Sequence, residues 1–215
     1  MSTVTPQTLS QDDHVRVTAA IKAAEKTTNG EIYCVLARSS DSYFYPAAFT
    51  LSIAMLVVSI VAAYALEYWW YGVQLHVFVA AQVLALGSAL SLLWALPGMA
   101  IWLVPAGLKY RRAHANAARQ FLARNVHRTR ARTGVLLFVS LAERYAEVLA
   151  DAGINEMVGQ ETWDKVVTLL ITEARHHRHA DGFVAAIEVV GNVLALHFPV
   201  SEGDINELDD HLVEI

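Results

Sequence analysis

Charged side chains are almost absent from residues 47–108 of this 215-residue chain, where Glu67 is the only one. Charged residues make up 17% of the whole chain and hydrophobic residues 55%. This composition excludes a disordered chain and is unusually apolar for a soluble globular protein.

Cysteine is nearly absent as well. Because Cys34 is the only one, no intramolecular disulfide can form, which favours a reducing compartment.

The sequence also lacks the motifs of several common catalytic sites. It contains no Gly-rich phosphate loop, no paired Cys and His pattern for zinc, and no G-x-S-x-G nucleophile motif. These absences do not name a reaction. What remains is the pattern of a membrane protein with a folded polar part.

The uncharged segment contains two apolar runs. Residues 47–66 and 73–96 carry no formal charge. At about 1.5 Å per residue, the first run is about 30 Å long, which is the thickness of the hydrocarbon core of a bilayer. The aromatic segment E-Y-W-W-Y-G between them, at 67–72, suits the lipid–water boundary. We predict two transmembrane helices joined as a hairpin; the alternative is a buried helical hairpin in a soluble protein.

The charges that follow the hairpin predict its orientation. Residues 109–132 hold eight basic side chains and no acidic one. Because basic residues concentrate on the cytoplasmic side of a membrane, we predict a bacterial inner (cytoplasmic) membrane protein with two spans and both termini in the cytoplasm. The basic segment directly follows a span and has little aromatic interleaving, which favours anionic lipid headgroups over nucleic acid. The predicted headgroup contacts are Lys109, Arg111, Arg112 and Arg119.

Apolar strands are predicted on both sides of the hairpin. The strand at 31–37 has no partner among residues 1–46, so it must pair with strands that follow the hairpin. One α/β domain, interrupted by the membrane hairpin, follows from that pairing. The later strands are expected at 135–141 and 145–151, and helices at 12–28, 111–132, 163–174 and from Asp181 onward. The predicted boundaries are 1–46 for the first helix and strand, 47–108 for the hairpin, 109–200 for the rest of the domain and 201–215 for an acidic tail.

The segments around the first two strands resemble the TPM domain family. Residues 28–32, T-N-G-E-I, are similar to the family's T-G-x-E-I, and residues 132–140, R-T-G-V-L-L-F-V-S, to its N-G-V-L-L-x-V-S. Glu143-Arg144 stands where the family usually has Asp-Arg, and residues 151–154, D-A-G-I, lie near its Gly-rich segment. The resemblance is closest to an uncharacterised bacterial membrane-protein branch. It implies a small mixed sheet with flanking helices, and some members of the family bind calcium or other divalent ions or have acid phosphatase activity.

Carboxylates at the ends of the predicted strands and helices are the candidate metal ligands. Glu143, Asp151 and Asp181 would hold a divalent cation such as calcium through oxygen ligands. Arg144 beside them would clamp a ligand or a phosphate group. The alternative is ordinary turn chemistry at 142–144 and a helix cap at Asp181.

A basic run, R-H-H-R-H, occupies residues 175–179, at the end of a predicted helix. Cations are favoured at a helix C-terminus by the helix dipole, so the run predicts a solvated helix end. The alternative is a transition-metal site formed by His176 and His179, which are three residues apart.

The tail, residues 201–215, holds six carboxylate side chains and no Lys or Arg. Ile205, Leu208 and Leu212 fall on one face of a short helix. We therefore predict that the tail docks on the domain through its apolar residues, with its carboxylates near the basic helix at 111–132. The alternative is a disordered, solvated tail.

Together these patterns predict a membrane-anchored module whose cytoplasmic α/β domain binds a ligand or a protein partner. A metal-dependent phosphatase is the alternative function.

Overall fold

The computed structural model of the chain describes residues 9–69, 72, 74–129, 132–201 and 208–215. The chain divides into two compact units. One, which we call the α/β unit, consists of residues 1–40 and 110–215, and the other, the helical unit, of residues 41–109.

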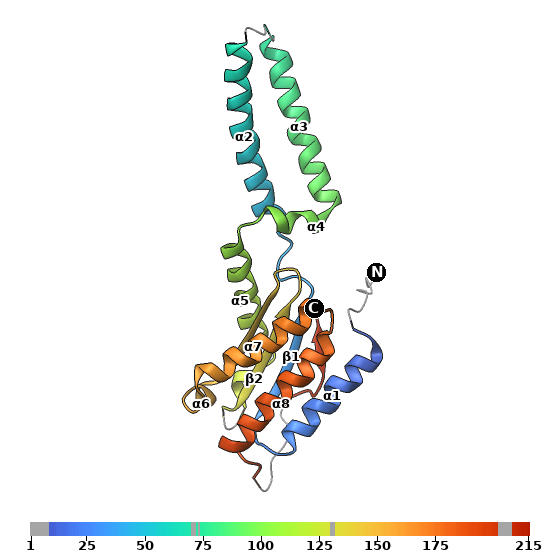
Figure 1. Cartoon of the computed structure of the whole chain (residues 1–215), viewed down its shortest axis with the longest axis vertical. Coiled ribbons are helices and arrows are strands. Elements are labelled where there is room, and N and C mark those ends of the chain that lie inside the picture. The colour runs from blue at the N-terminus through green and yellow to red at the C-terminus, as the bar shows by residue number, and fades with distance from the viewer. Residues whose placement is uncertain (1–8, 70–71, 73, 130–131, 202–207) are drawn as a thin grey trace. The chain divides into compact units, whose positions relative to one another are not determined.

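A four-stranded mixed sheet forms the centre of the α/β unit (Figure 1), with the strand order β3-β2-β1-β4. β1 is parallel to both of its neighbours, and β3 is antiparallel to β2. The pairing of β1 with β2 joins segments that lie before and after the helical unit in sequence, so the predicted pairing across residues 47–108 is confirmed. The strands are β1 Glu31–Ala37, β2 Gly134–Ser140, β3 Tyr145–Ala150 and β4 Leu212–Glu214.

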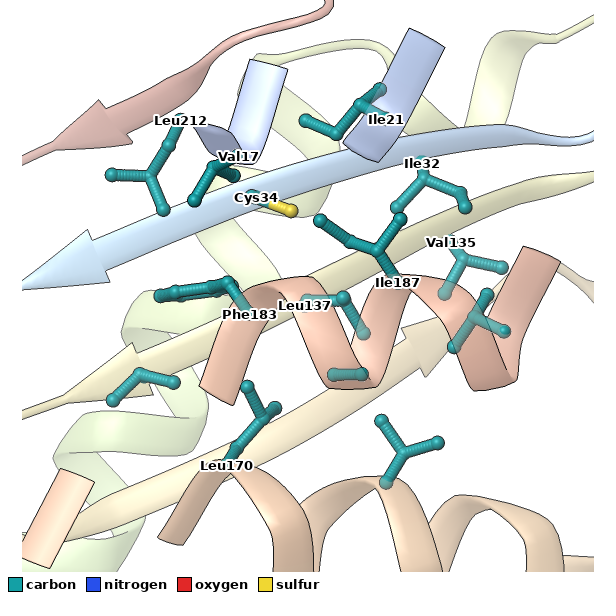
Figure 2. Close-up of a cluster of buried hydrophobic side chains, with 14 of the residues drawn as sticks. Val17, Ile21, Ile32, Cys34, Val135, Leu137, Leu170, Phe183, Ile187 and Leu212 are labelled. Atoms are coloured by element: carbon teal, nitrogen blue, oxygen red, sulfur yellow. The ribbon is translucent and has the colours of Figure 1, made fainter. Parts of the chain in front are cut away.

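Every residue of β1 and β2 is buried, as expected for central strands covered on both faces. One face packs against three helices, α1 Gln11–Glu25, α7 Gln160–Arg175 and α8 His179–His197. In Figure 2, Ile21 of α1 and Ile187 of α8 lie over Ile32 and Val135 on this face.

The other face of the sheet packs against α5, Ala106–Ala123, through Ala117 and Phe121. These side chains meet Leu136 and Phe138 of β2. The sheet therefore separates two apolar cores, and a mixed α/β fold with helices on both faces is confirmed.

Local residues mark one end each of α1 and α5. α1 begins after Ser10, whose hydroxyl accepts a hydrogen bond from the N–H of Asp13, while the Asp13 carboxylate accepts one from the N–H of Ser10. The helix predicted at 111–132 is wrong at its C-terminal end. α5 ends at Ala123 because Asn125 adopts a left-handed backbone conformation, with φ 57°, and a short 3₁₀ helix, Val126–Arg128, follows.

The C-terminal segment is a strand where the sequence favours a helix. Leu212 is buried in the core beneath α1 and α8, and β4 pairs in parallel with β1. Leu208 packs against the core on the α5 side. Docking of the tail through apolar residues is therefore confirmed for residues 208–215. Ile205 and the carboxylates at 202, 204 and 207 lie outside the described residues.

The helical unit consists mainly of two long apolar helices. The hydroxyls of Thr50, Ser52 and Ser59 donate to backbone carbonyl oxygens one turn earlier in their helix. The unit contains α2 Phe44–Tyr68, α3 Leu75–Ala95, α4 Pro97–Ala100 and the 3₁₀ helix η1 Ile101–Leu103.

Among the described residues, three helices are long and apolar enough to cross a membrane by length and composition, where the sequence predicts two. They are α2, α3 and α8. The helices differ in burial: of the most apolar stretch of each, 0% is buried in α2, 6% in α3 and 44% in α8.

Candidate cationic cavity

An open cavity of about 530 Å³ lies beside the C-terminal end of β2, between the β2–β3 turn and the end of α7. Its volume is in the range of small-molecule sites. The apolar wall on the sheet side is formed by Val139, Leu141 and Ala146. The wall on the α7 side is formed by Ile171 and Ala174. Four basic side chains also line it, namely Arg144, Arg175, His177 and His179.

Two residues with left-handed backbones bring basic side chains to this cavity. Arg144, with φ 53°, closes the β2–β3 turn, where its N–H donates to the carbonyl oxygen of Leu141. His177, with φ 59°, follows α7 and its N–H donates to the carbonyl oxygen of Ala174. The N–H of Arg178 donates to the carbonyl oxygen of Glu173, so α7 ends in a Schellman motif with His177 where glycine is usual. Both backbones are ones that non-glycine residues seldom adopt.

The two arginines of the cavity differ from their neighbours in lacking a carboxylate partner. Arg16 contacts Asp181 at 2.5 Å, and Arg178 contacts Glu173 at 2.7 Å. Among the described residues, no carboxylate lies within ion-pair distance of Arg144 or Arg175. The cavity therefore carries two uncompensated positive charges, which favour an anion.

The histidines add donors and acceptors to the same cavity. The rings of His177 and His179 meet edge to face, with centroids 6.2 Å apart. Burial, together with the nearby His177, lowers the pKa of His179. The Nδ1 atom of His179 is buried and has no hydrogen-bond partner within the described part of the chain.

The three carboxylates predicted as metal ligands are not brought together. Glu143 and Asp151 flank β3 at opposite ends, and its six residues span about 20 Å at about 3.4 Å per residue. Asp181 lies in the first turn of α8, beside Arg16. The helix cap predicted at Asp181 is wrong, since Arg178 occupies that position. In the described ranges, no cluster of three or more His, Cys, Asp or Glu side chains is arranged to hold a metal ion.

Each of the two strand-end carboxylates has a structural role instead. Glu143 is buried, and its carboxylate accepts hydrogen bonds from the backbone N–H of Ser40, at 2.8 Å, and from the hydroxyl of Ser140. It thereby links the end of β1 to the β2–β3 turn. Asp151 caps the short helix α6, Ala152–Asn155, by accepting from the N–H of Ala152.

The predicted headgroup residues lie on α5. Arg111, Arg112 and Arg119 are exposed, and Lys109 is half-buried. Arg119 also donates to the carbonyl oxygen of Ala115 at 3.3 Å.

Of the basic residues that line the cavity, only Arg144 is a candidate ligand-binding residue by sequence. For the run at 175–179 the sequence predicts a solvated helix end. The rings that approach each other are those of His177 and His179, rather than His176 and His179. The high density of basic residues at 175–179 was the indication of this cavity available in the sequence. The left-handed backbone at His177 could not be predicted, because no glycine marks that position.

No model of a known protein family matches the chain, and no curated protein matches it. Among solved structures, the chain is similar to the NMR structure of BA42 protein from the psychrophilic bacterium Bizionia argentinensis, with a TM-score of 0.60 and 19% sequence identity. The similarity covers 100% of this chain and 99% of that chain. At this level of identity, what the two proteins share is the fold.

Proposed function

We propose that this chain is a membrane-anchored binding module with a TPM-like α/β unit, which faces the cytoplasm and holds its ligand in the cationic cavity. In this proposal α2 and α3 form a two-span transmembrane hairpin. The observation that carries the proposal is the exposed apolar surface of these helices, whose most apolar stretches are buried to only 0% and 6%.

Exposure of this kind is unfavourable in water. Phe49, Val58 and Val83 are each at least 65% exposed, and exposed apolar surface costs about 25 cal/mol per Å² relative to an apolar environment. A bilayer would cover these side chains. The hydroxyls of α2 donate to its own backbone, and Ser59 contacts Gln82 of α3, which suits helices in a medium without water.

The third apolar helix, α8, fits better as a core helix of the α/β unit than as a membrane span. Phe183, Val190 and Leu194 of α8 are buried in the α/β unit. In sequence α8 lies between β3 and β4, which belong to one sheet. A single crossing by α8 would separate those strands by a membrane, whereas two crossings by α2 and α3 leave β1 and β2 on the same side.

The cavity supports binding more than hydrolysis. Its described lining contains four basic side chains and no carboxylate. A metal-dependent phosphatase needs oxygen ligands for the metal, and none of Glu143, Asp151 and Asp181 is among the described residues that line this cavity.

Membrane anchoring can be tested by alkaline carbonate extraction of cell membranes. The wild-type chain should stay in the pellet. Leu56→Lys, at the middle of α2, should reduce membrane retention because a central lysine costs about 2.5–3.5 kcal/mol on insertion. Leu196→Lys is the matched control, since Leu196 is an exposed apolar residue of α8, and it should behave like the wild type. Release of the wild-type chain by carbonate would overturn the anchor.

A further inference from the structure

We infer that the cationic cavity binds an amphiphile with a phosphate monoester headgroup, the phosphate lying between Arg144 and Arg175 and the apolar part lying along the sheet and α7. This inference rests on the proposed function of the cavity as the ligand site. It adds the chemical class of the ligand.

The charge balance points to a phosphate monoester. Arg144 and Arg175 line one cavity and have no carboxylate partner among the described residues. Two guanidinium groups match a dianion, and a phosphate monoester carries a charge of about −1.5 to −2 near neutral pH. Each guanidinium can donate two parallel hydrogen bonds to phosphate oxygens.

The histidines complete the set of polar partners. His177 and His179 line the same cavity. A phosphate monoester has three terminal oxygens, so it can accept hydrogen bonds from two arginines and an imidazole together. A carboxylate has only two oxygens and one negative charge, and it would leave part of this set unmatched.

The apolar walls of the cavity indicate that the ligand has an apolar part. Val139, Leu141 and Ala146 face Ile171 and Ala174 across a cavity of about 530 Å³. That volume is typical of sites for drug-sized ligands and exceeds the needs of a lone inorganic anion. A ligand with a hydrocarbon part beside its phosphate would remove these apolar walls from water. The ligand can come from two sources, a phosphatidic acid headgroup in the bilayer or a soluble alkyl phosphate.

The test uses the full chain in nanodiscs of phosphatidylcholine, which carries no phosphate monoester. Binding of dodecyl phosphate, inorganic phosphate and dodecanoate would be measured by calorimetry. We expect dodecyl phosphate to bind at least tenfold more tightly than either of the others. Equal affinity for inorganic phosphate would overturn the amphiphile, and equal affinity for dodecanoate would overturn the phosphate group.

Substitutions assign the binding to the cavity. Arg175→Gln and Arg144→Gln should each weaken dodecyl phosphate binding about tenfold or more, because each removes charge-assisted hydrogen bonds. Lys165→Gln is the matched control on an exposed position of α7 outside the cavity lining, and it should change the affinity less than twofold. An unchanged thermal midpoint would establish that each variant is folded. Wild-type affinity in folded Arg175→Gln would overturn the site.

A second pair of nanodiscs distinguishes the sources. If the bilayer supplies the ligand, phosphatidic acid added to the disc should compete with soluble dodecyl phosphate. If the ligand is soluble, phosphatidic acid should leave the affinity for dodecyl phosphate unchanged. Both results keep the phosphate monoester.

The carbonate extraction of the Leu56→Lys variant does not involve the cavity. A chain that stays in the membrane but binds no alkyl phosphate therefore overturns this inference alone.

Discussion

At the scale of single residues, Gly134 illustrates how closely the sheet and the segment after α5 approach each other. A Cβ atom at Gly134 would lie 2.1 Å from the carbonyl oxygen of Val126 and 2.8 Å from its Cγ1. Because the nearest atom belongs to the backbone, the clash cannot be relieved by a side-chain rotation. The glycine in the T-G-V-L-L segment is therefore required for packing.

Gly134→Ala should destabilise the α/β unit by about 1–3 kcal/mol, the usual cost of overpacking a closed site. Chemical denaturation of the protein in detergent micelles would measure this change. Gly159→Ala is the control, because its Cβ would meet nothing within 4 Å and its φ is −68°. Similar stabilities for the two variants would contradict the close approach.

Glu25 is a second residue whose surroundings have a measurable consequence. The pKa of its carboxyl group is raised from 4.5 to about 8, chiefly by burial and also by the nearby Glu31 and Asp210, while the hydrogen bond from the N–H of Ile32 acts in the opposite direction. The folded protein thus keeps a proton on Glu25 that the unfolded chain loses. The resulting stabilisation is fully present below about pH 4.5, falls as the pH rises, and is lost above about pH 8.

Glu25→Gln should remove this pH dependence, since glutamine stays neutral and keeps the oxygen that accepts from Ile32. Thermal midpoints of the wild type and the variant in nanodiscs would be compared between pH 5 and 9, a range that includes the pKa of about 8. We expect the variant to become increasingly more stable than the wild type as the pH rises through this range. Parallel profiles would mean that Glu25 is ionised in the folded protein.

At the scale of elements, β1 and β2 could be predicted from the sequence because each is a nearly continuous apolar segment. β1 and β2 are predicted almost to the residue, since strands buried on both faces need no alternation. The end of α5 could not be predicted, because Asn125 adopts its left-handed conformation without a distinctive pattern around it. β4 was missed because a strand of three residues depends on the open edge of β1, a partner remote in sequence.

The cavity was predictable only in part for a similar reason. Arg144 follows a recognisable strand end, whereas Arg175 and His177 reach the same cavity only because α7 packs beside β3. The carboxylates of Glu143 and Asp151 accept hydrogen bonds from nearby backbone N–H groups. Local spacing in the sequence cannot separate such a carboxylate from a metal ligand.

The short strand β4 makes the C-terminal tail part of the core. Leu212→Ala should destabilise the α/β unit by about 2–4 kcal/mol, because Leu212 is only 2% exposed and a cavity would replace its side chain. Ile215→Ala is the matched control, since Ile215 is 37% exposed. Denaturation of both variants in micelles would measure the difference. A Leu212→Ala variant as stable as the control would favour the solvated tail considered from the sequence.

At the scale of the whole molecule, the sheet limits how the chain can cross a membrane. β1 precedes the helical unit, while β2, β3 and β4 follow it, and all four belong to one sheet. If the chain crosses a bilayer, the segments on either side of residues 41–109 must therefore lie on the same side of it. An even number of crossings satisfies this condition, and the proposed hairpin of α2 and α3 would provide two.

The charge distribution then predicts which side that is. Residues 109–132 carry eight basic side chains and no acidic one, whereas residues 67–72 include none that is basic. Retention of basic residues in the cytoplasm should leave the α/β unit, its cavity and both termini in the cytoplasm, with residues 67–72 outside. A reporter that is active only after export should be inactive when fused to the C-terminus and active when inserted after Gly72. A reporter that becomes active only in the cytoplasm should give the opposite pattern at both positions. An exported C-terminus would reverse the orientation and give the cavity access to ligands outside the cell membrane instead of to those in the cytoplasm.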